Sequence, residues 1–231
     1  HARLCCLTDL AYEPTSTHHE RTPMSVVTES PFAPLARAAA ETPTALWNDS
    51  ADPVELAKSI AFGAVGATCN PVIALTAIRS HPDVWGPRIL ELAAEHPTWG
   101  ESELGWAAVK ELSLHAAGLL EPAFDASGGR NGRLSIQTDP RLHRDAAALV
   151  DQAVEFSQIA RNIIVKIPAT ATGIAAMEEA AYRGVSINAT LSFTVPQAVA
   201  VGSALERARD RRAADGLADV EFGHVGAIMR G

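Results

Sequence analysis

From residue 44 onward, short apolar segments alternate with longer segments in which apolar residues recur at three- and four-residue spacing. The short segments are rich in Val, Ile and Leu, which is typical of strands buried on both faces. The longer segments have the spacing of amphipathic helices. The pattern predicts strands at residues 44–47, 67–69, 134–138, 163–167, 185–191 and 220–228, and helices at 53–66, 72–79, 84–94, 103–124, 145–160, 174–182 and 196–213.

The alternation of strands and helices also predicts the fold. Connections of only a few residues require a parallel sheet with helical crossovers, and a doubly wound sheet and a (β/α)8 TIM barrel both fit. No G-x-G-x-x-G sequence follows the first strand, which disfavours a dinucleotide-binding fold. We therefore expect an α/β protein with a (β/α)8 TIM barrel, truncated after about the sixth strand because a barrel has eight. Residues 24–231 would form this barrel domain without its C-terminal units, and the polar, pattern-free residues 1–23 would be disordered or upstream of the true start.

Composition excludes several classes of function. The chain of 231 residues is 47% apolar and has a net charge of −8, with acidic and basic residues interspersed. This charge disfavours nucleic acid and anionic membrane surfaces as partners, and no apolar run of about 18 residues predicts a membrane span. The three cysteines include the adjacent Cys5 and Cys6, which do not form a disulfide framework, so we expect a cytoplasmic protein.

Lys166 is one of only three lysines, and it stands inside the apolar segment 163–168. A lysine in a buried strand loses hydration, so it has to be paired or to release its proton readily. An unprotonated amine is the nucleophile that forms a Schiff base with a carbonyl. The alternative is a strand-end lysine whose ammonium group reaches solvent. The strand sequence by itself does not distinguish a nucleophilic lysine from a solvent-reaching one.

Polar residues follow several of the predicted strands. In a parallel barrel the reactive groups lie at the carboxyl ends of the strands. Here these ends would bring a carboxylate, amides and hydroxyl groups around the amine, and no histidine, so a Ser/His triad is not expected. The candidates are Asp49, Thr68, Asn70, Gln137, Asp139, Lys166, Asn188, Thr190 and, after the last strand, Arg230.

Five motifs at these strand ends, in this order, resemble those of the transaldolase family. They are Asn-Asp-Ser-Ala-Asp-Pro at 48–53, Gly-Ala-Thr-Cys-Asn-Pro at 66–71, Leu-Ser-Ile-Gln-Thr-Asp-Pro-Arg-Leu at 134–142, Ile-Val-Lys-Ile-Pro-Ala-Thr at 164–170, and Ile-Asn-Ala-Thr-Leu-Ser-Phe at 187–193 with Gln197. The resemblance implies a class I aldolase-type barrel that needs no metal or organic cofactor. It further implies transfer of a dihydroxyacetone unit from a ketose phosphate to an aldose phosphate, in the pentose phosphate pathway or in a specialised sugar pathway.

The resemblance also implies roles for the candidate residues. Lys166 matches the Schiff-base lysine, Asp49 the acid/base aspartate, and Thr190 the threonine that helps to hold the catalytic water. A protonated imine is an electron sink, and cleavage needs a base for the hydroxyl proton, so these roles are chemically consistent. The substrate would be held by Thr68, Asn70 and Asn188 through its hydroxyl groups and by Arg230 through its phosphate.

Structural roles compete with some of these assignments. Asp49 could cap the following helix, although Asp52 before Pro53 fills that position better. Asn70 before Pro71 could be a plain turn residue. Cys69 is expected to be a small packed residue.

Gln137 departs from the family pattern. Most transaldolases carry a glutamate there, whereas the related fructose-6-phosphate aldolases carry a glutamine, which can orient a water but cannot accept its proton. Three hypotheses therefore remain: a transaldolase-type transferase, an aldolase with the same lysine mechanism, and a catalytically silent truncated barrel. Sugar phosphates are the expected small-molecule partners. Homo-oligomer formation stays open, because an open barrel exposes two sheet edges.

Overall fold

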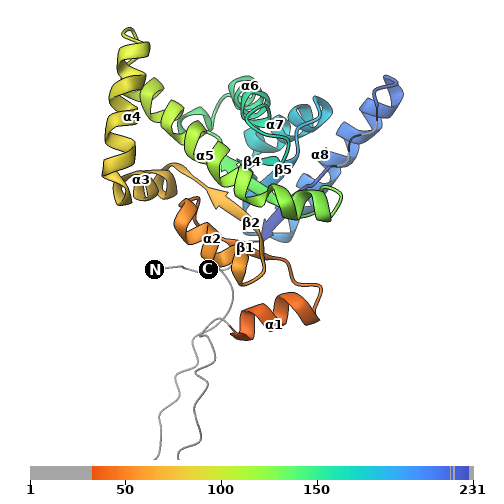
Figure 1. The fold of residues 1–231 in the computed structure, drawn as a ribbon. Coiled ribbons are helices and arrows are strands. Elements are labelled where there is room, and N and C mark those ends of the chain that lie inside the picture. Colours follow the sequence, from red (N-terminus) through yellow and green to blue (C-terminus); the bar gives the residue numbers. More distant parts are fainter. Residues whose placement is uncertain (1–32, 219, 221, 229–231) are drawn as a thin grey trace, which may run out of the picture.

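A computed structural model describes residues 33–218, 220 and 222–228. Its centre is one six-stranded sheet in which every strand is parallel to its neighbour and the order follows the sequence (Figure 1). This order confirms the expected parallel α/β fold and excludes the shuffled strand order of a doubly wound sheet. The strands are β1 Leu46–Asn48, β2 Ala64–Cys69, β3 Arg133–Gln137, β4 Ile163–Pro168, β5 Ile187–Ser192 and β6 Val225–Ile228.

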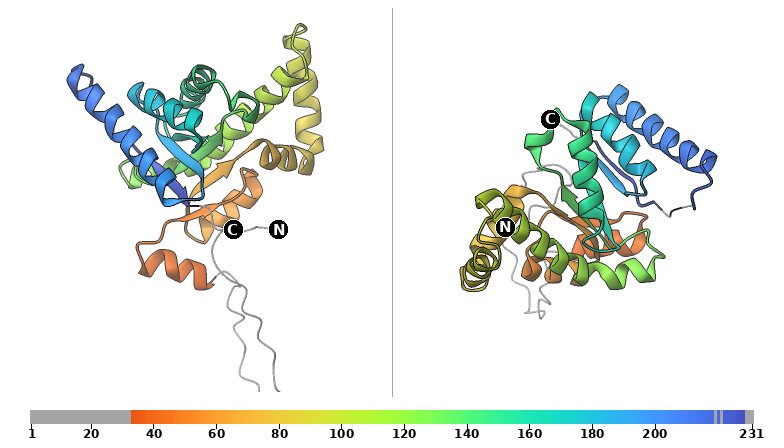
Figure 2. Two further views of the ribbon diagram at one scale, coloured as in Figure 1. Left: turned by 180° about the vertical axis from the view of Figure 1, so that it is seen from behind. Right: turned by 90° about the horizontal axis from the view of Figure 1, so that it is seen from above.

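Helices connect the strands and lie along the outside of the curled sheet, as the view from above shows (Figure 2). The sheet, its curl and its helical crossovers are those of a (β/α) barrel. The helices are α1 Ala33–Glu41, α2 Pro53–Ala61, α3 Pro71–Ser80, α4 Pro82–Glu95, α5 Glu101–Ala126, α6 Ala146–Ser157, α7 Ala171–Tyr182 and α8 Val195–Ala214, with the short 3₁₀ helix η1 Pro140–Leu142 after β3.

The two faces of the sheet have different chemistry. Along β3, Leu134 and Ile136 point outward and belong to the apolar core between sheet and helices. Ser135 and Gln137 alternate with them and therefore point to the inner face. Because paired residues of neighbouring strands share a face, this alternation places the polar strand-end residues together inside the curl, as the sequence predicts.

The end of the first predicted helix was wrong. The pattern places this end near Gly66, but α2 ends at Ala61 and β2 already begins at Ala64. Gly63 adopts a φ of +95°, a conformation that glycine tolerates and side-chain-bearing residues avoid, so the chain leaves the helix there. Gly66 instead lies within β2. Helix α1 was not predicted.

Two predictions fall on residues that the structure does not describe. The disordered or upstream character expected of residues 1–23 and the phosphate contact expected of Arg230 lie outside the described ranges. Among the residues that are described, no helix combines the length and the apolar character needed to cross a bilayer.

Candidate active site

Three candidate side chains form a row across the inner face of the sheet. Gln137 of β3 is the register partner of Lys166 on β4, and Lys166 is the partner of Asn188 on β5. The three residues therefore project side by side at the carboxyl ends of neighbouring strands. They line a cavity of about 530 Å³ together with Asp49, Thr68 and Thr190.

Lys166 is half-buried, and its ammonium group has no hydrogen bond or ion pair with any described residue. Its strand neighbours Val165 and Ile167 are fully buried in the core on the other face. The apolar segment is thus a strand whose outer face packs against helices and whose one polar side chain enters the cavity. A buried lysine can be tolerated by pairing with a carboxylate, but Lys166 has no such pair among the described residues.

Asn188 offers an unused acceptor beside the lysine. The residue is 5% exposed, and its Nδ2 donates to Ser135 Oγ at 2.9 Å. Its Oδ1 is buried and has no protein partner among the described residues. A buried acceptor without a partner costs about 1–3 kcal/mol. A hydroxyl donor in the cavity would remove that cost.

Asp49 and Thr68 lie together at the ends of β1 and β2. Thr68 Oγ1 donates to Asp49 Oδ1 at 2.5 Å, and both residues line the cavity. Asp49 is not the cap of α2: that position belongs to Asp52, whose Oδ1 accepts from the backbone N–H groups of Val54 and Glu55. Within the described part of the chain, the other carboxylate oxygen of Asp49 accepts no hydrogen bond, so it is available to a ligand.

Asn70 is in a different situation from the other candidates. Its Oδ1 caps α3 by accepting from Val72 N and Ile73 N, both at 2.9 Å. It is not among the residues that line the cavity. Its amide nitrogen makes no hydrogen bond with the described residues, so a contact with substrate through this nitrogen stays a prediction.

Thr190 and the neighbouring Leu191 line the cavity from β5. Thr190 is buried, and its carbonyl accepts from Ala169 N at 2.6 Å. Leu191 has a φ of +57°, the one described non-glycine residue in the left-handed region. The sequence contains no local signal for this conformation, because leucine rarely adopts it.

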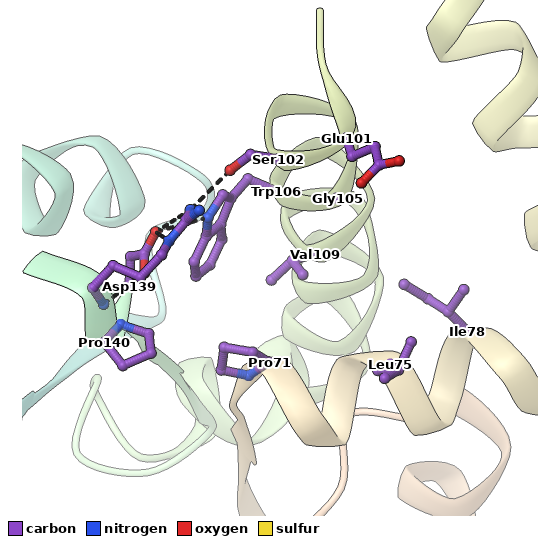
Figure 3. Close-up of a pocket in the computed structure, with 11 residues that line it drawn as sticks. Pro71, Leu75, Ile78, Glu101, Ser102, Gly105, Trp106, Val109, Asp139 and Pro140 are labelled. Carbon is purple, nitrogen blue, oxygen red and sulfur yellow. Dashed lines mark hydrogen bonds and ion pairs between the residues drawn. The ribbon is translucent and has the colours of Figure 1, made fainter.

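Asp139 organises the loop that follows Gln137. Its carboxylate accepts from Trp106 Nε1 at 3.2 Å and from the guanidinium of Arg141 (Figure 3). Its own N–H donates to Gln152 Oε1 at 2.6 Å. The Arg141 guanidinium holds the pKa of this carboxyl below its ordinary value, although burial opposes the shift. Asp139 was a strand-end candidate, whereas Trp106 and Gln152 were not predicted, because they come from distant helices.

The comparisons with known proteins agree with this geometry. The profile of the family described as Transaldolase/Fructose-6-phosphate aldolase matches residues 46–220. The chain belongs to this transaldolase/fructose-6-phosphate aldolase family. The match covers all of the strand-end candidates except Arg230.

Individual transaldolases give the same result over part of their length. "Transaldolase 2" of Streptomyces avermitilis is 37% identical over 155 residues, which is 64% of this chain and 40% of the relative. "Transaldolase 1" of Streptomyces coelicolor is 39% identical over 57% of this chain and 34% of the relative. "Transaldolase" of Thiobacillus denitrificans is 35% identical over 70% of this chain and 45% of the relative. The chain therefore spans less than half the length of the curated relatives it matches.

Two other residues of the family motifs have structural roles. Cys69 is fully buried, and burial raises the pKa of its thiol to about 11, so it is a packed, unreactive residue as expected. Gln197 connects Ala169, which follows β4, to Leu191 in β5 through its side-chain amide.

Proposed function

We propose that this member of the transaldolase/fructose-6-phosphate aldolase family transfers a dihydroxyacetone unit between sugar phosphates through a Schiff base on Lys166. The observation that carries the proposal is the row formed by Gln137, Lys166 and Asn188. It puts an amine, which has no partner among the described residues, between two amides in a cavity large enough for a small ligand. We further propose that the enzyme acts in cytoplasmic carbohydrate metabolism, with no nucleic acid or membrane partner.

The reaction begins at the amine. The unprotonated Nζ of Lys166 adds to the C2 carbonyl of a ketose phosphate to form a carbinolamine. The carbinolamine takes up one proton from solvent and loses one water, which leaves a protonated imine. This imine withdraws electrons from the neighbouring C3–C4 bond. The strand around Lys166 supports this step, because the neighbouring Val165 and Ile167 are buried in the core and Lys166 lines the cavity.

Asp49 is the proposed base for bond cleavage. It takes the proton of the C4 hydroxyl group, the C3–C4 electrons move into the imine as an enamine, and an aldose phosphate leaves. The enamine then attacks the aldehyde of an acceptor aldose, and Asp49 returns its proton to the new hydroxyl group. The hydrogen bond from Thr68 supports this role because it orients the carboxylate toward the cavity.

The remaining candidates hold water and substrate. Thr190 and Gln137 are proposed to orient the water that leaves during imine formation and returns during hydrolysis. Asn188, through its free buried oxygen, accepts from a substrate hydroxyl group, and Thr68 and Asn70 contact other hydroxyl groups. Arg230 is the proposed phosphate ligand.

A direct aldolase is the second candidate function, and Gln137 is the observation that favours it. A glutamine cannot take the proton of a water, and the aldolase branch of the resemblance has a glutamine here. In that case free dihydroxyacetone leaves the enzyme after hydrolysis of the imine. Product analysis with and without an acceptor aldose separates the two candidates, since only the transferase needs the acceptor for turnover.

Borohydride trapping tests the shared chemistry. The full-length protein is incubated with fructose 6-phosphate and borohydride, and the adduct is located by intact mass and peptide mapping. We expect a reduced dihydroxyacetone adduct on Lys166. Lys166→Met should abolish the adduct, whereas Lys110→Met is the matched control, because Lys110 is ion-paired with Glu155 on the surface. No adduct on the folded wild-type protein would contradict both candidates and favour a catalytically silent barrel.

A further inference from the structure

Gln197 lies in the first turn of α8, and both ends of its side-chain amide are used. Its Oε1 accepts from the backbone N–H groups of Phe193 at 3.0 Å and Thr194 at 3.1 Å. Its Nε2 donates to the carbonyls of Ala169 at 2.9 Å and Leu191 at 3.2 Å. The oxygen thus caps a helix, whereas the nitrogen joins two chain segments that are distant in sequence.

The two segments that Gln197 joins lie at the carboxyl ends of the strands that carry Lys166 and Thr190. Ala169 comes after β4, the strand of Lys166, and Leu191 lies in β5 next to Thr190. Ala169 is buried and is held on both sides, because its N–H donates to Thr190 O at 2.6 Å and its carbonyl accepts from Gln197. A chain of hydrogen bonds therefore runs from Gln197 through Ala169 to Thr190.

The backbone that Gln197 holds is strained. Leu191 has a φ of +57° and lines the cavity with 42% of its surface exposed. A non-glycine residue in this region is strained and persists only where its surroundings enforce it. The hydrogen bond from Gln197 Nε2 to the Leu191 carbonyl helps to hold this conformation. It thereby fixes Leu191, the residue next to Thr190.

We infer that Gln197 is a positioning residue that holds Thr190 in register with Lys166 across the ends of β4 and β5. The expected effect on catalysis rests on the proposed function. It needs no contact between Gln197 and substrate, because Gln197 acts through the backbone of Ala169 and Leu191. A displacement of about 1 Å at a reacting group can cost about 10²-fold in rate, so loss of the bridge should slow the chemistry.

The helix cap and the bridge can be separated by substitution. Gln197→Glu keeps an acceptor for Phe193 N and Thr194 N, and glutamate is favoured at this position of a capping box. It replaces the donor by a carboxylate oxygen that faces two carbonyls, so the bridge is lost. Thr194→Ala is the matched control. It removes the Thr194 hydroxyl, which caps Gln197 N and donates to Gln197 Oε1, and it removes neither of the two bonds that Gln197 Nε2 donates.

The first measurement is the rate of borohydride trapping in the full-length protein with fructose 6-phosphate. We expect Gln197→Glu to lower this rate about 10²-fold with a melting temperature close to that of the wild type. Thr194→Ala should lower the melting temperature by roughly 2–4 °C and trap at the wild-type rate. A wild-type trapping rate in Gln197→Glu, or an equal rate loss in Thr194→Ala, would overturn the inference.

The second measurement is independent of catalysis. Hydrogen exchange at the Ala169 amide reports the bond to Thr190 O, and we expect faster exchange in Gln197→Glu but not in Thr194→Ala. Unchanged exchange would contradict the bridge directly. If the wild-type protein forms no adduct, the proposed function fails, and the exchange experiment still decides whether Gln197 holds the two strand ends together.

Discussion

Two cations lie on the inner face of the same sheet, at opposite ends, and their surroundings differ sharply. Arg133 at the start of β3 is 3% exposed, donates to Gly129 O at 2.8 Å and to Ser186 Oγ at 3.3 Å, and lies 5.1 Å from the centre of the Phe124 ring. Lys166 at the end of β4 has no described partner. The first cation is built into the structure, whereas the second is left available to a ligand.

The difference follows the polarity of a parallel barrel. Residues at the amino ends of the strands contribute to stability, and residues at the carboxyl ends carry out chemistry. Substitutions at the two cations should therefore separate stability from activity. Removing Arg133 should lower the free energy of unfolding, whereas removing Lys166 should leave the protein folded but inactive.

The largest effect is expected from Lys166→Met. Methionine replaces the apolar stem, so the fold should be retained, while the nucleophile is lost and ketose cleavage should fall by about 10⁴-fold or more. Steady-state rates and urea unfolding of the same preparation measure both quantities. Retained activity would contradict the Schiff-base mechanism, and a large loss of stability would show that Lys166 is a structural cation after all.

Arg133→Met should have the opposite profile. The carbonyl of Gly129 and the hydroxyl of Ser186 would lose a buried donor, which we expect to lower the free energy of unfolding by about 3–5 kcal/mol. Arg161→Met is the matched control, because Arg161 also lies over the Phe124 ring but is about half exposed, and it should lower the free energy of unfolding far less. Urea unfolding measures both, and equal costs would contradict the comparison.

His224, near Arg133, sharpens the comparison through pH. Burial, assisted by the positive charge of Arg133, lowers the pKa of His224 to about 4, and its Nδ1 accepts from Ile187 N at 3.0 Å. In the unfolded chain His224 is protonated below about pH 6.5, whereas in the folded chain it stays neutral down to about pH 4. The folded state is therefore progressively destabilised relative to the unfolded state as the pH falls from about 6.5 to about 4. We expect a loss of at most about 3 kcal/mol. His224→Asn, which keeps an acceptor, should remove this dependence in urea unfolding at pH 7 and pH 4.5.

Much of the architecture could be predicted from local patterns. The alternation within residues 134–138 and 185–191 assigns side chains to the two faces of the sheet, and the shared polarity of parallel strands brings their ends together. Gln137, Lys166 and Asn188 could therefore be placed in one cavity without a structure. The end of α2 could not, because the left-handed conformation of Gly63 decides it and the glycine at 66 looked equally suitable.

Contacts between distant segments explain what the sequence did not reveal. Trp106 and Gln152 hold Asp139 from two different helices, and no spacing within either helix indicates this. For Asn70 the local sequence is ambiguous, because an asparagine suits a helix cap and a substrate contact equally well. A local pattern reports the face on which a side chain lies, but not the partner that it finds there.

The smallest expected effect concerns the hydrogen-bond network of Asp139, at the carboxyl ends of the strands. The Arg141 guanidinium keeps the pKa of Asp139 below its ordinary value, so the stabilisation is present above about pH 4 and is lost as the pH falls further. Asp139→Asn should lower the free energy of unfolding at pH 7 by about 1 kcal/mol, since Arg141 is largely exposed, and should cost less at pH 3. Urea unfolding at both pH values measures this. An equal cost at both would show that the bond to Trp106, and not the charge of Asp139, holds the loop behind Gln137.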